Sequence, residues 1–447
     1  MTLRLKLNLS HLYFYLRSPV RTLYWRAIKL KDQIYWPSVE LKNRIYWSLY
    51  DSKHLSVLID AVRRPKIYLQ VVISSLRVIF RGKKLVLIYL LYRGHQSWVD
   101  GVVQKLAKDP KFGVIIFTHD AALPKSQGKN IKVFFLDSSK PFRGLNLLPA
   151  VFADLYLTPT SVTGNNAAFI YPKVHFFHSL VSVHFVYEND TFSDYQFIYC
   201  AGQHHIEEMK EWFADRNLKN KCLIPGGYPK LDSLLAKRSQ LVKTRTDGIK
   251  NTVIFAPTLL SKKSEKFSAL LVDGKQIIKL LLESGYQVTF RPHPLNLEKT
   301  DPYASLVEGL IEEFQSHARF TLDRSVDYFE SYENSDLMIT DISGTGFTYG
   351  LGFERPVVFV SPNEGEHSPQ KGVEFLCRKD IGKVVEDVQC LPKVCREILD
   401  NFESYQKNLL EFRSKFIFNV GESDDYFMKN ISYIITGKKH PDWTYID

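Results

Sequence analysis

Short apolar segments alternate with longer amphipathic segments along the chain after residue 84. The apolar segments form a first set at 84–92, 112–119, 131–137, 153–160 and 173–179, and a second set at 251–258, 286–294, 319–323, 335–341 and 355–362. Helical stretches such as 274–284 and 303–316 lie between them, and this alternation is typical of parallel strands in βαβ units. The pattern predicts two doubly wound α/β domains that face each other across a cleft.

The polar segment 236–250 separates the two sets. It is rich in Lys, Arg, Ser and Thr, which predicts a linker. We therefore expect a first Rossmann-like domain at 84–235 and a second at 251–447, the second ending in helices. Residues 1–83 follow a different pattern.

The segment 1–83 carries an 11-residue repeat, in which one aliphatic and two aromatic residues open each unit at positions 12, 23, 34 and 45. An 11-residue period corresponds to 3.67 residues per turn, so the triplets fall along one face of an α-helix. Lys and Arg occupy much of the remaining surface. Pro19 and Pro37 divide such a helix into shorter pieces.

The basic charge of the protein is concentrated in the same segment. Residues 1–84 hold 17 Lys/Arg against 4 Asp/Glu, whereas the remaining residues hold 42 against 44. A basic helical region with an aromatic face suits the surface of an anionic membrane, or it packs as a layer on the rest of the protein. The longest apolar run, 68–80, is too short to span a bilayer and contains Arg77. Nothing resembles a secretory signal or a nucleic-acid-binding motif.

Composition is that of a globular protein, with 447 residues of which 45% are hydrophobic and 24% charged. The five cysteines include no C-x-x-C pair, which argues against a zinc site and a disulfide framework and favours a reducing, cytosolic setting. Because no other cluster has metal-ligand spacing, we expect no metal in the chemistry.

A polar turn at 341–346, with the sequence DISGTG, follows an apolar strand and precedes an apolar helix. Free N–H groups at a helix N-terminus favour an anion such as phosphate, particularly at the carboxyl end of a parallel strand. The alternative is that Asp341 and Ser343 cap the helix while the glycines turn the chain.

Other polar residues follow neighbouring strands and are expected on the same rim of the second sheet. In the second domain they are Thr258, Arg291, His293, Asp341, Ser343 and Thr345. In the first domain, His175 and His178 stand at the end of the last predicted strand, on the rim expected to face the same cleft. Capping alone does not account for so many polar residues at strand ends.

The stretch from about 170 to 420 resembles the CDP-glycerol glycerophosphotransferase family, which comprises teichoic acid and capsule polymerases and primases of the GT-B fold. Five blocks in family order carry the resemblance. They are FFHSL (176–180), GGYPKLDSL (226–234), VIFAPTLL (253–260), TFRPHP (289–294) and the segment from SDLMITD to ERPVVFV (335–360). The resemblance implies a GT-B fold, an acceptor-side first domain and a nucleotide-donor second domain.

The resemblance also implies roles for individual residues. His178 corresponds to the histidine proposed as general base for the acceptor hydroxyl, and His293 with Arg291 to the pair near the pyrophosphate of the donor. The phosphate-binding turn is matched by Ser343, Gly344 and Thr345, with Thr258 beside it and Asp341 in support. These side chains suit those roles, because an imidazole near its reference pKa accepts an alcohol proton at neutral pH and a guanidinium binds phosphate oxygens.

Three positions depart from the family pattern. Ser179 replaces the glycine that follows the histidine, the segment LVSVHF lacks the usual lysine, and Thr348 replaces an acidic residue. These departures leave room for another CDP-polyol or a nucleotide sugar as donor. His184 either substitutes for the missing lysine or belongs to a structural helix.

The resemblance thus implies a transferase that moves glycerol phosphate, or a related polyol phosphate, from a CDP-linked donor to a lipid-linked teichoic acid or capsule glycan. It implies no cofactor beyond the activated donor, no nucleic-acid partner, and a peripheral position on an anionic membrane at its cytoplasmic face. The alternatives are a nucleotide-sugar glycosyltransferase of surface polysaccharide synthesis and a non-catalytic protein that binds polymer or partner enzymes.

Overall fold

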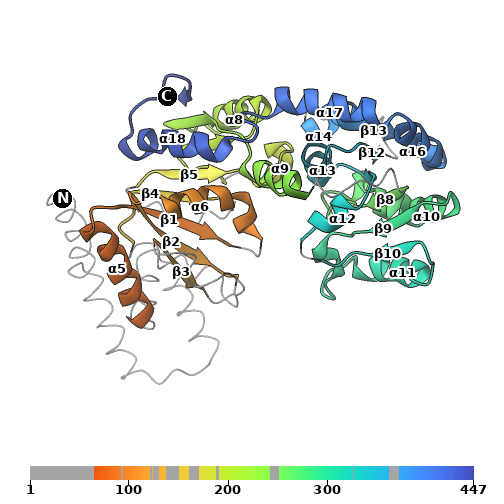
Figure 1. Ribbon diagram of the computed structural model, residues 1–447, viewed down its shortest axis with the longest axis horizontal. Helices are drawn as coiled ribbons and strands as arrows, with labels where there is room; N and C mark the ends of the chain where they lie inside the picture. The colour runs from red at the N-terminus through yellow and green to blue at the C-terminus, as the bar shows by residue number, and fades with distance from the viewer. Residues whose placement is uncertain are drawn as a thin grey trace, which may run out of the picture. The chain divides into compact units, whose positions relative to one another are not determined.

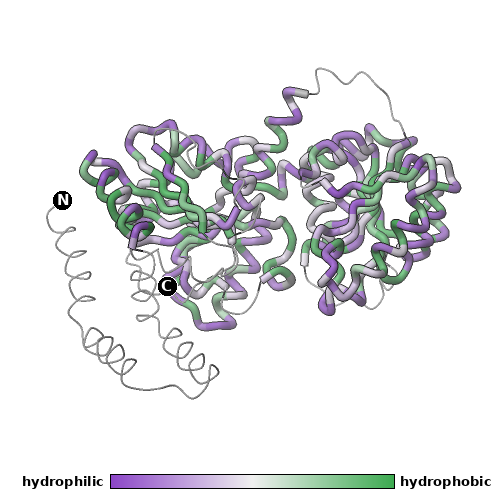
Figure 2. The backbone as a smooth tube through the Cα atoms, turned by 90° about the horizontal axis from the view of Figure 1, so that it is seen from below, coloured by the Kyte–Doolittle hydropathy of each residue, from purple (hydrophilic) through white to green (hydrophobic). Residues whose placement is uncertain are grey.

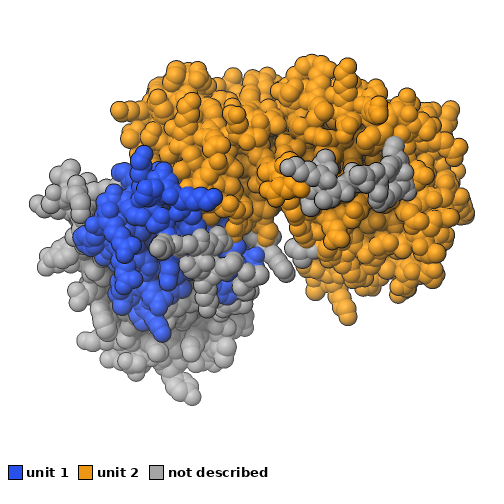
Figure 3. Space-filling view, in the orientation of Figure 1, with its two compact units in different colours: residues 1–93, 106–158, 162–173 blue, residues 94–105, 159–161, 174–447 orange. Residues whose placement is uncertain are grey.

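The computed structural model describes residues 65–91, 94–120, 123, 130–136, 151–160, 171–187, 191–241, 251–325, 327–361 and 372–447 (Figure 1). The predicted repeat that begins at position 12 lies outside these residues. Two compact units divide the chain (Figure 3). The first comprises 1–93, 106–158 and 162–173, and the second 94–105, 159–161 and 174–447. Of the helices that the structure describes, none combines the length and the apolar character needed to cross a bilayer.

The first unit contains four parallel strands in the order β4-β1-β2-β3. They are β1 (Lys84–Leu90), β2 (Phe112–Thr118), β3 (Ile131–Phe135) and β4 (Leu155–Thr158). Helix α5 (Pro65–Phe80) packs on β1 and β2. It comes so close that a Cβ atom on Gly113 would lie 2.6 Å from the Val78 side chain, which explains a glycine inside β2.

In the second unit, a first group of strands runs in the order β5-β6-β7-β14. They are β5 (Lys173–Phe176), all but its first residue in this unit, β6 (Phe197–Cys200), β7 (Lys221–Pro225) and β14 (Thr444–Ile446). The last strand pairs antiparallel with β7. The same unit contains helices α8 (Gln203–Asp215), α9 (Pro229–Leu241) and α18 (Ser423–Thr436). It also contains the short helix η1 (His95–Trp98) and the part of α6 (Asp100–Lys108) up to residue 105.

The second unit also contains a six-stranded parallel sheet in the order β10-β9-β8-β11-β12-β13. The strands are β8 (Thr252–Phe255), β9 (Gln287–Phe290), β10 (Phe320–Leu322), β11 (Leu337–Thr340), β12 (Val357–Val360) and β13 (Gly382–Val385). The chain runs outward from β8 to β10 and then outward again from β11 to β13 on the other side. The direction therefore reverses between β8 and β11, which is where doubly wound sheets place their ligands.

Helices cover this sheet and close its core. They include α10 (Ala269–Glu283), α11 (Ala304–Phe314), α12 (Phe329–Glu333), α13 (Gly344–Phe353), α14 (Val373–Leu376), α15 (Arg378–Ile381), α16 (Leu391–Asp400) and α17 (Phe402–Phe416). Figure 2 shows hydrophobic residues concentrated along the central strands. All four residues of β11 and of β12 are buried, as expected for parallel strands covered on both faces.

The ten predicted strands are all present, and the predicted helices 274–284 and 303–316 correspond to α10 and α11. The prediction of an α/β fold with doubly wound parallel sheets is therefore confirmed. Helix α9 extends to Leu241, into the predicted linker, and residues 242–250 lie outside the described residues. The predicted domain boundaries stay predictions.

Candidate active site

The turn after β11 is a capped helix N-terminus. Ser343 is the N-cap of α13, and its hydroxyl oxygen accepts a hydrogen bond from the Thr345 N–H at 3.3 Å. The predicted cap is thus present. It leaves Ser343, Gly344 and Thr345 partly exposed at the positive end of the helix, so the same turn also offers an anion site.

Asp341 lies beneath this turn and joins three segments. Its buried carboxylate accepts hydrogen bonds from the Thr258 N–H at 3.0 Å and the Ala269 N–H at 3.1 Å. Burial raises the pKa of Asp341 to about 7, against the opposing effect of these bonds. Asp341 therefore fixes the loop after β8 and the start of α10 relative to the turn, and it does not face the open side of the site.

Arg291 and His293 follow β9, next to β8. The guanidinium of Arg291 forms an ion pair with Asp323 and donates a hydrogen bond to the Ser325 hydroxyl at 3.1 Å. His293 caps the short helix η5 (Pro294–Leu297), where its Nδ1 accepts a hydrogen bond from the Leu295 N–H at 3.3 Å. Burial and then the charge of Arg291 lower the pKa of His293, so its imidazole is neutral at pH 7.

Tyr332 connects Arg291 to the turn. Its hydroxyl lies 3.0 Å from the Thr345 hydroxyl. Burial raises the pKa of Tyr332, and the bond to Thr345 and the charge of Arg291 oppose that rise. The structure therefore brings the segment after β9 and the turn after β11 together on one rim, as predicted.

His178 follows β5 within the same compact unit. Its Nδ1 lies 2.9 Å from the Tyr187 hydroxyl, and its ring centroid lies 5.3 Å from that of Trp98. Burial lowers the pKa of His178 to about 4, although the backbone of Pro159 opposes this and the charge of Lys230 adds to it. A neutral, partly exposed imidazole is the form that accepts a proton.

Side chains from other elements hold the backbone of the loop 178–183. The carbonyl oxygen of His178 accepts a hydrogen bond from the Tyr228 hydroxyl at 3.1 Å. The Leu180 carbonyl oxygen lies 3.1 Å from a ring nitrogen of His204, and the Val181 carbonyl oxygen lies 3.3 Å from one of His205. The Ser182 N–H donates a hydrogen bond to Glu374 at 3.0 Å, and the Val183 N–H donates one to Glu208 at 2.7 Å. These bonds fix the position of His178 before any substrate binds.

The loop 178–183 packs directly against the start of α13. A Cβ atom on Gly344 would lie 2.9 Å from the Ser179 hydroxyl and 3.3 Å from the Val181 side chain. Gly344 is thus needed for close approach, and Ser179, which departs from the family pattern, fills that contact. His178 and the turn at 343–345 therefore belong to one site.

Two sequence interpretations of histidines need correction or completion. His175 was expected on the rim, but its ring is fully buried among Phe177, Tyr187, Phe192 and Tyr195, because it lies inside β5 and not at its end. His184 is exposed in the short helix α7 (Val183–Val186), with its ring 5.4 Å from Trp212. Whether it substitutes for the missing lysine stays a prediction.

Lys230 lies near His178 but was not among the predicted site residues. Its ammonium lies 5.3 Å from the ring centroid of Trp98 and 5.0 Å from that of Tyr328, and its charge reaches His178. Lys230 belongs to the block GGYPKLDSL, so the motif was visible, but a lysine at the start of a helix carries no functional signal by itself. The charge that reaches His178 thus comes from α9, whereas the family pattern has a lysine in the segment after His178.

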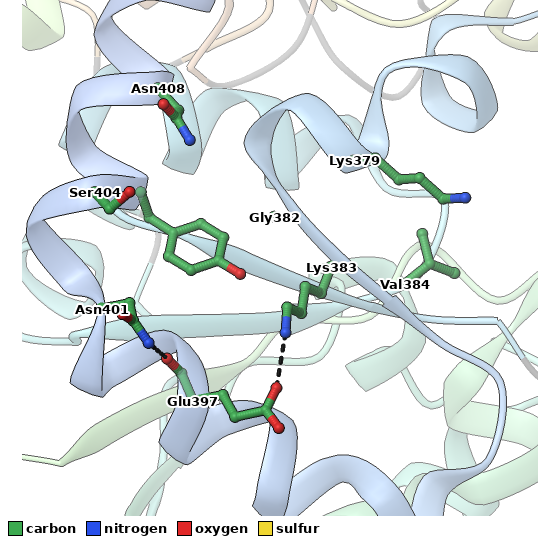
Figure 4. A pocket seen from close by; sticks show the side chains of 9 residues that line it. Lys379, Gly382, Lys383, Val384, Glu397, Asn401, Ser404 and Asn408 are labelled. Atoms are coloured by element: carbon green, nitrogen blue, oxygen red, sulfur yellow. Dashed lines mark hydrogen bonds and ion pairs between the residues drawn. The ribbon is translucent and has the colours of Figure 1, made fainter.

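A cavity of about 710 Å³ lies elsewhere in the same unit (Figure 4). It is lined by residues of α15, β13, α16 and α17, including the ion pair between Lys383 and Glu397, whose atoms are 2.8 Å apart. None of the predicted site residues lines it. Its position at the edge strand β13, away from the carboxyl ends of β8 and β11, separates it from the candidate active site.

Comparison with protein families assigns the chain. A family model described as CDP-glycerol:poly(glycerophosphate) glycerophosphotransferase matches residues 186–432, which is more than half of the chain. The chain belongs to this family. It is a CDP-glycerol glycerophosphotransferase-like transferase, and the match confirms the resemblance inferred from the five sequence blocks. No curated protein sequence matches it significantly.

Solved structures agree with this family in fold. A variant of the wall teichoic acid polymerase TagF with CDPG is 16% identical, with a TM-score of 0.53 over 86% of this chain and 98% of the TagF chain in that structure. The UDP-GlcNAc 2-epimerase from Neisseria meningitidis is 12% identical, with a TM-score of 0.54 over 78% of this chain and 99% of the epimerase. A putative epimerase from Listeria monocytogenes is 14% identical, with a TM-score of 0.55 over 80% and 98%. At these identities the comparison shows the GT-B fold.

Proposed function

We propose that this glycerophosphotransferase transfers glycerol phosphate from CDP-glycerol to a hydroxyl group of a lipid-linked teichoic acid acceptor. The supporting observation is the direct packing of the loop carrying His178 on the first residue of α13, since it sets a proton acceptor beside an anion-binding turn. The fold similarity to TagF, a wall teichoic acid polymerase, is consistent with this proposal.

The proposed reaction is an in-line displacement at the phosphorus that carries the glycerol. The acceptor oxygen forms the new P–O bond while the bond to the bridging oxygen of the diphosphate breaks, and CMP leaves with the electron pair. His178 takes the proton of the acceptor hydroxyl. The N-terminus of α13 and Arg291 stabilise the negative charge on the diphosphate, and His293 lies beside Arg291 on the same rim.

Arg291 needs free N–H donors for this role. Its guanidinium is paired with Asp323, and both side chains are about nine-tenths buried. A guanidinium has five N–H donors, so it can keep one bond to Asp323 and offer others to a phosphate oxygen. Asp323 thus orients Arg291, as the Asp341 carboxylate orients the turn.

Donor selectivity provides the central test. Isothermal titration of the full chain with CDP-glycerol, CDP-ribitol and UDP-GlcNAc should show tightest binding of CDP-glycerol, and CMP should be released when a primer ending in glycerol phosphate is added. Tighter binding of UDP-GlcNAc, with release of UDP to a glycan acceptor, would replace this proposal by the glycosyltransferase alternative. Binding of every nucleotide without turnover would support a non-catalytic role.

The basic aromatic segment 1–83 is proposed to bind the anionic membrane that holds the acceptor lipid. Deletion of residues 1–60 should abolish sedimentation with vesicles containing phosphatidylglycerol and leave CDP-glycerol affinity unchanged. Unchanged sedimentation would contradict membrane binding by this segment. Loss of folding in the truncated protein would instead indicate that the segment packs on the protein.

A further inference from the structure

Lys230 stands out among the lysines of α9 because of its surroundings. Its ammonium lies between the rings of Trp98 and Tyr328, at 5.3 and 5.0 Å from their centroids. Within the described part of the chain it has no carboxylate within 4 Å and no hydrogen-bond acceptor. Lys237, two turns later on the same helix, also lies over an aromatic ring but is paired with Asp327 at 3.2 Å.

An ammonium between two aromatic rings is stabilised by cation–π attraction but keeps its three N–H donors. Burial lowers the pKa of Lys230 to about 8, and the charge of Asp327 opposes this shift. The group therefore stays mostly protonated at neutral pH. A partly buried cation that lacks an anionic partner favours the binding of an external anion.

The neighbours of Lys230 indicate which anion. The Trp98 ring is a common neighbour of Lys230 and His178, since its centroid lies 5.3 Å both from the ammonium and from the His178 ring centroid, and the charge of Lys230 reaches His178. His95 lies 4.4 Å from Trp98, and burial lowers its pKa to about 3, so both imidazoles are neutral. Asp327, the acidic residue whose charge reaches Lys230, is paired with Lys237 at 3.2 Å, so the site suits the oxygen atoms of a phosphate.

We propose that Lys230 binds the phosphodiester that adjoins the attacking hydroxyl of the acceptor. This inference rests on the proposed function, in which His178 accepts the proton of that hydroxyl. In a glycerol phosphate chain the terminal hydroxyl and the nearest phosphodiester belong to the same three-carbon unit, so one site meets both. The diphosphate of the donor has its own cation in Arg291, on the rim beside Tyr332 and the turn after β11.

Such a subsite makes Lys230 a specificity-determining residue. It favours acceptors that already end in glycerol phosphate over acceptors that end in an uncharged sugar. The protein then extends a chain more readily than it starts one, because the first transfer to a neutral acceptor lacks the contact with Lys230.

The test uses glycerophosphoglycerol as a probe for the acceptor end and CDP-glycerol as a probe for the donor. Both are titrated calorimetrically into the full chain and into Lys230→Met, Lys230→Arg and the control Lys237→Met. We expect Lys230→Met to bind glycerophosphoglycerol at least about 10-fold more weakly and CDP-glycerol as the wild type does. Lys237→Met should match the wild type with both probes.

The pH dependence gives a second readout that does not need the methionine variant. Of the groups that face Lys230, His95 and His178 titrate far below pH 7, the charge of Asp327 raises the pKa of Lys230 against burial, and burial raises the pKa of Tyr328. Affinity of the wild type for glycerophosphoglycerol should therefore fall between pH 7 and pH 9 as Lys230 loses its proton. Lys230→Arg should remove this dependence, because arginine stays protonated.

Several outcomes would overturn the inference. They are unchanged probe binding in Lys230→Met, no saturable binding of glycerophosphoglycerol to the wild type with or without CMP, and a pH dependence that persists in Lys230→Arg. Weaker CDP-glycerol binding in Lys230→Met would assign the lysine to the donor phosphates instead. Failure of the wild type to bind CDP-glycerol would refute the proposed donor but would leave the glycerophosphoglycerol titration interpretable.

Discussion

The two sides of the candidate active site are built in different ways. The turn at 341–346 supplies its own anchoring side chains, since Ser343 caps α13 and Asp341 accepts the N–H bonds that tie it to the loop after β8. The loop 178–183 is fixed by side chains far away in the sequence, for example by Glu374, which lies 192 residues from Ser182. The turn is therefore recognisable from a short motif, whereas the geometry of the loop depends on the complete fold.

The largest expected effect separates the two sides by function. His178→Ala should reduce turnover by roughly 10²–10⁴-fold while CDP-glycerol affinity stays unchanged, because the variant loses the proton acceptor and not the phosphate contacts. The control is His184→Ala, since His184 is exposed in α7 directly after the same loop. Near-normal turnover of His178→Ala would exclude the base, and a loss of donor affinity would move His178 to the donor side.

On the donor side, the largest effect is expected at Arg291. Arg291→Ala should weaken CDP-glycerol binding by about 1.5–3 kcal/mol, because a charged hydrogen-bond donor to phosphate is lost. Arg413 is a matched control, since it is also largely buried and paired with a glutamate, Glu354. Arg413→Ala should lower the free energy of unfolding and leave CDP-glycerol binding unchanged. Equal donor affinity in both variants would mean that the diphosphate lies elsewhere.

The free energy of unfolding should depend on pH in opposite directions through the histidines on the loop side and through Asp341 on the turn side. Burial lowers the pKa of His95 and His204 to about 3 and of His178 to about 4. The unfolded chain then binds more protons than the folded one below pH 6.5, so each histidine lowers the free energy of unfolding by about 1.4 kcal/mol per pH unit as the pH falls towards its folded pKa.

Asp341 acts in the opposite direction on the turn side. Its pKa is raised to about 7, so its contribution to stability decreases as pH rises from 3.8 to 7. Urea denaturation at pH 7, 6 and 5 measures the balance. His204→Gln keeps an N–H donor for the Leu180 carbonyl oxygen. This variant should reduce the slope of the unfolding free energy against pH by the amount that corresponds to about one proton. An unchanged slope in this variant would show that His204 is not neutral in the folded protein.

The smallest expected effect tests the two uses of Ser343. Ser343→Ala should lower both the free energy of unfolding and the CDP-glycerol binding energy by about 1 kcal/mol, because the hydroxyl caps α13 and is proposed to contact the donor phosphates. Ser268, the N-cap of α10, provides a matched control, since its hydroxyl accepts a hydrogen bond from the Leu271 N–H at 3.3 Å. Ser268→Ala should lower stability alone. If Ser343→Ala behaves in the same way, the turn only caps the helix.

The sequence predicted much of the fold because buried parallel strands are continuous apolar runs. The strands β6, β7, β13 and β14 were not predicted. They are three to five residues long, and β13 begins with Gly382, where a Cβ atom would lie 1.7 Å from the Val357 carbonyl oxygen. Such strands are defined by their partners, which a local pattern does not contain.

The same limit applies to the site. DISGTG and RPHP are local signals, and the structure places them together as expected, with Tyr332 between Arg291 and Thr345. His175 and His178 were predicted alike, although one is buried inside β5 and the other follows it. Lys230 was not singled out, because its significance depends on Trp98 and Tyr328, which come from two distant segments.

The strand β14 has a consequence for biosynthesis. It covers the edge of β7, which is translated about 220 residues earlier. At ribosomal speeds of 5–20 residues per second, that edge waits roughly 10–45 seconds for its partner. An unpaired edge strand is a template for association with other chains. The β7 edge therefore stays open to association with other chains until residues 444–446 have been made.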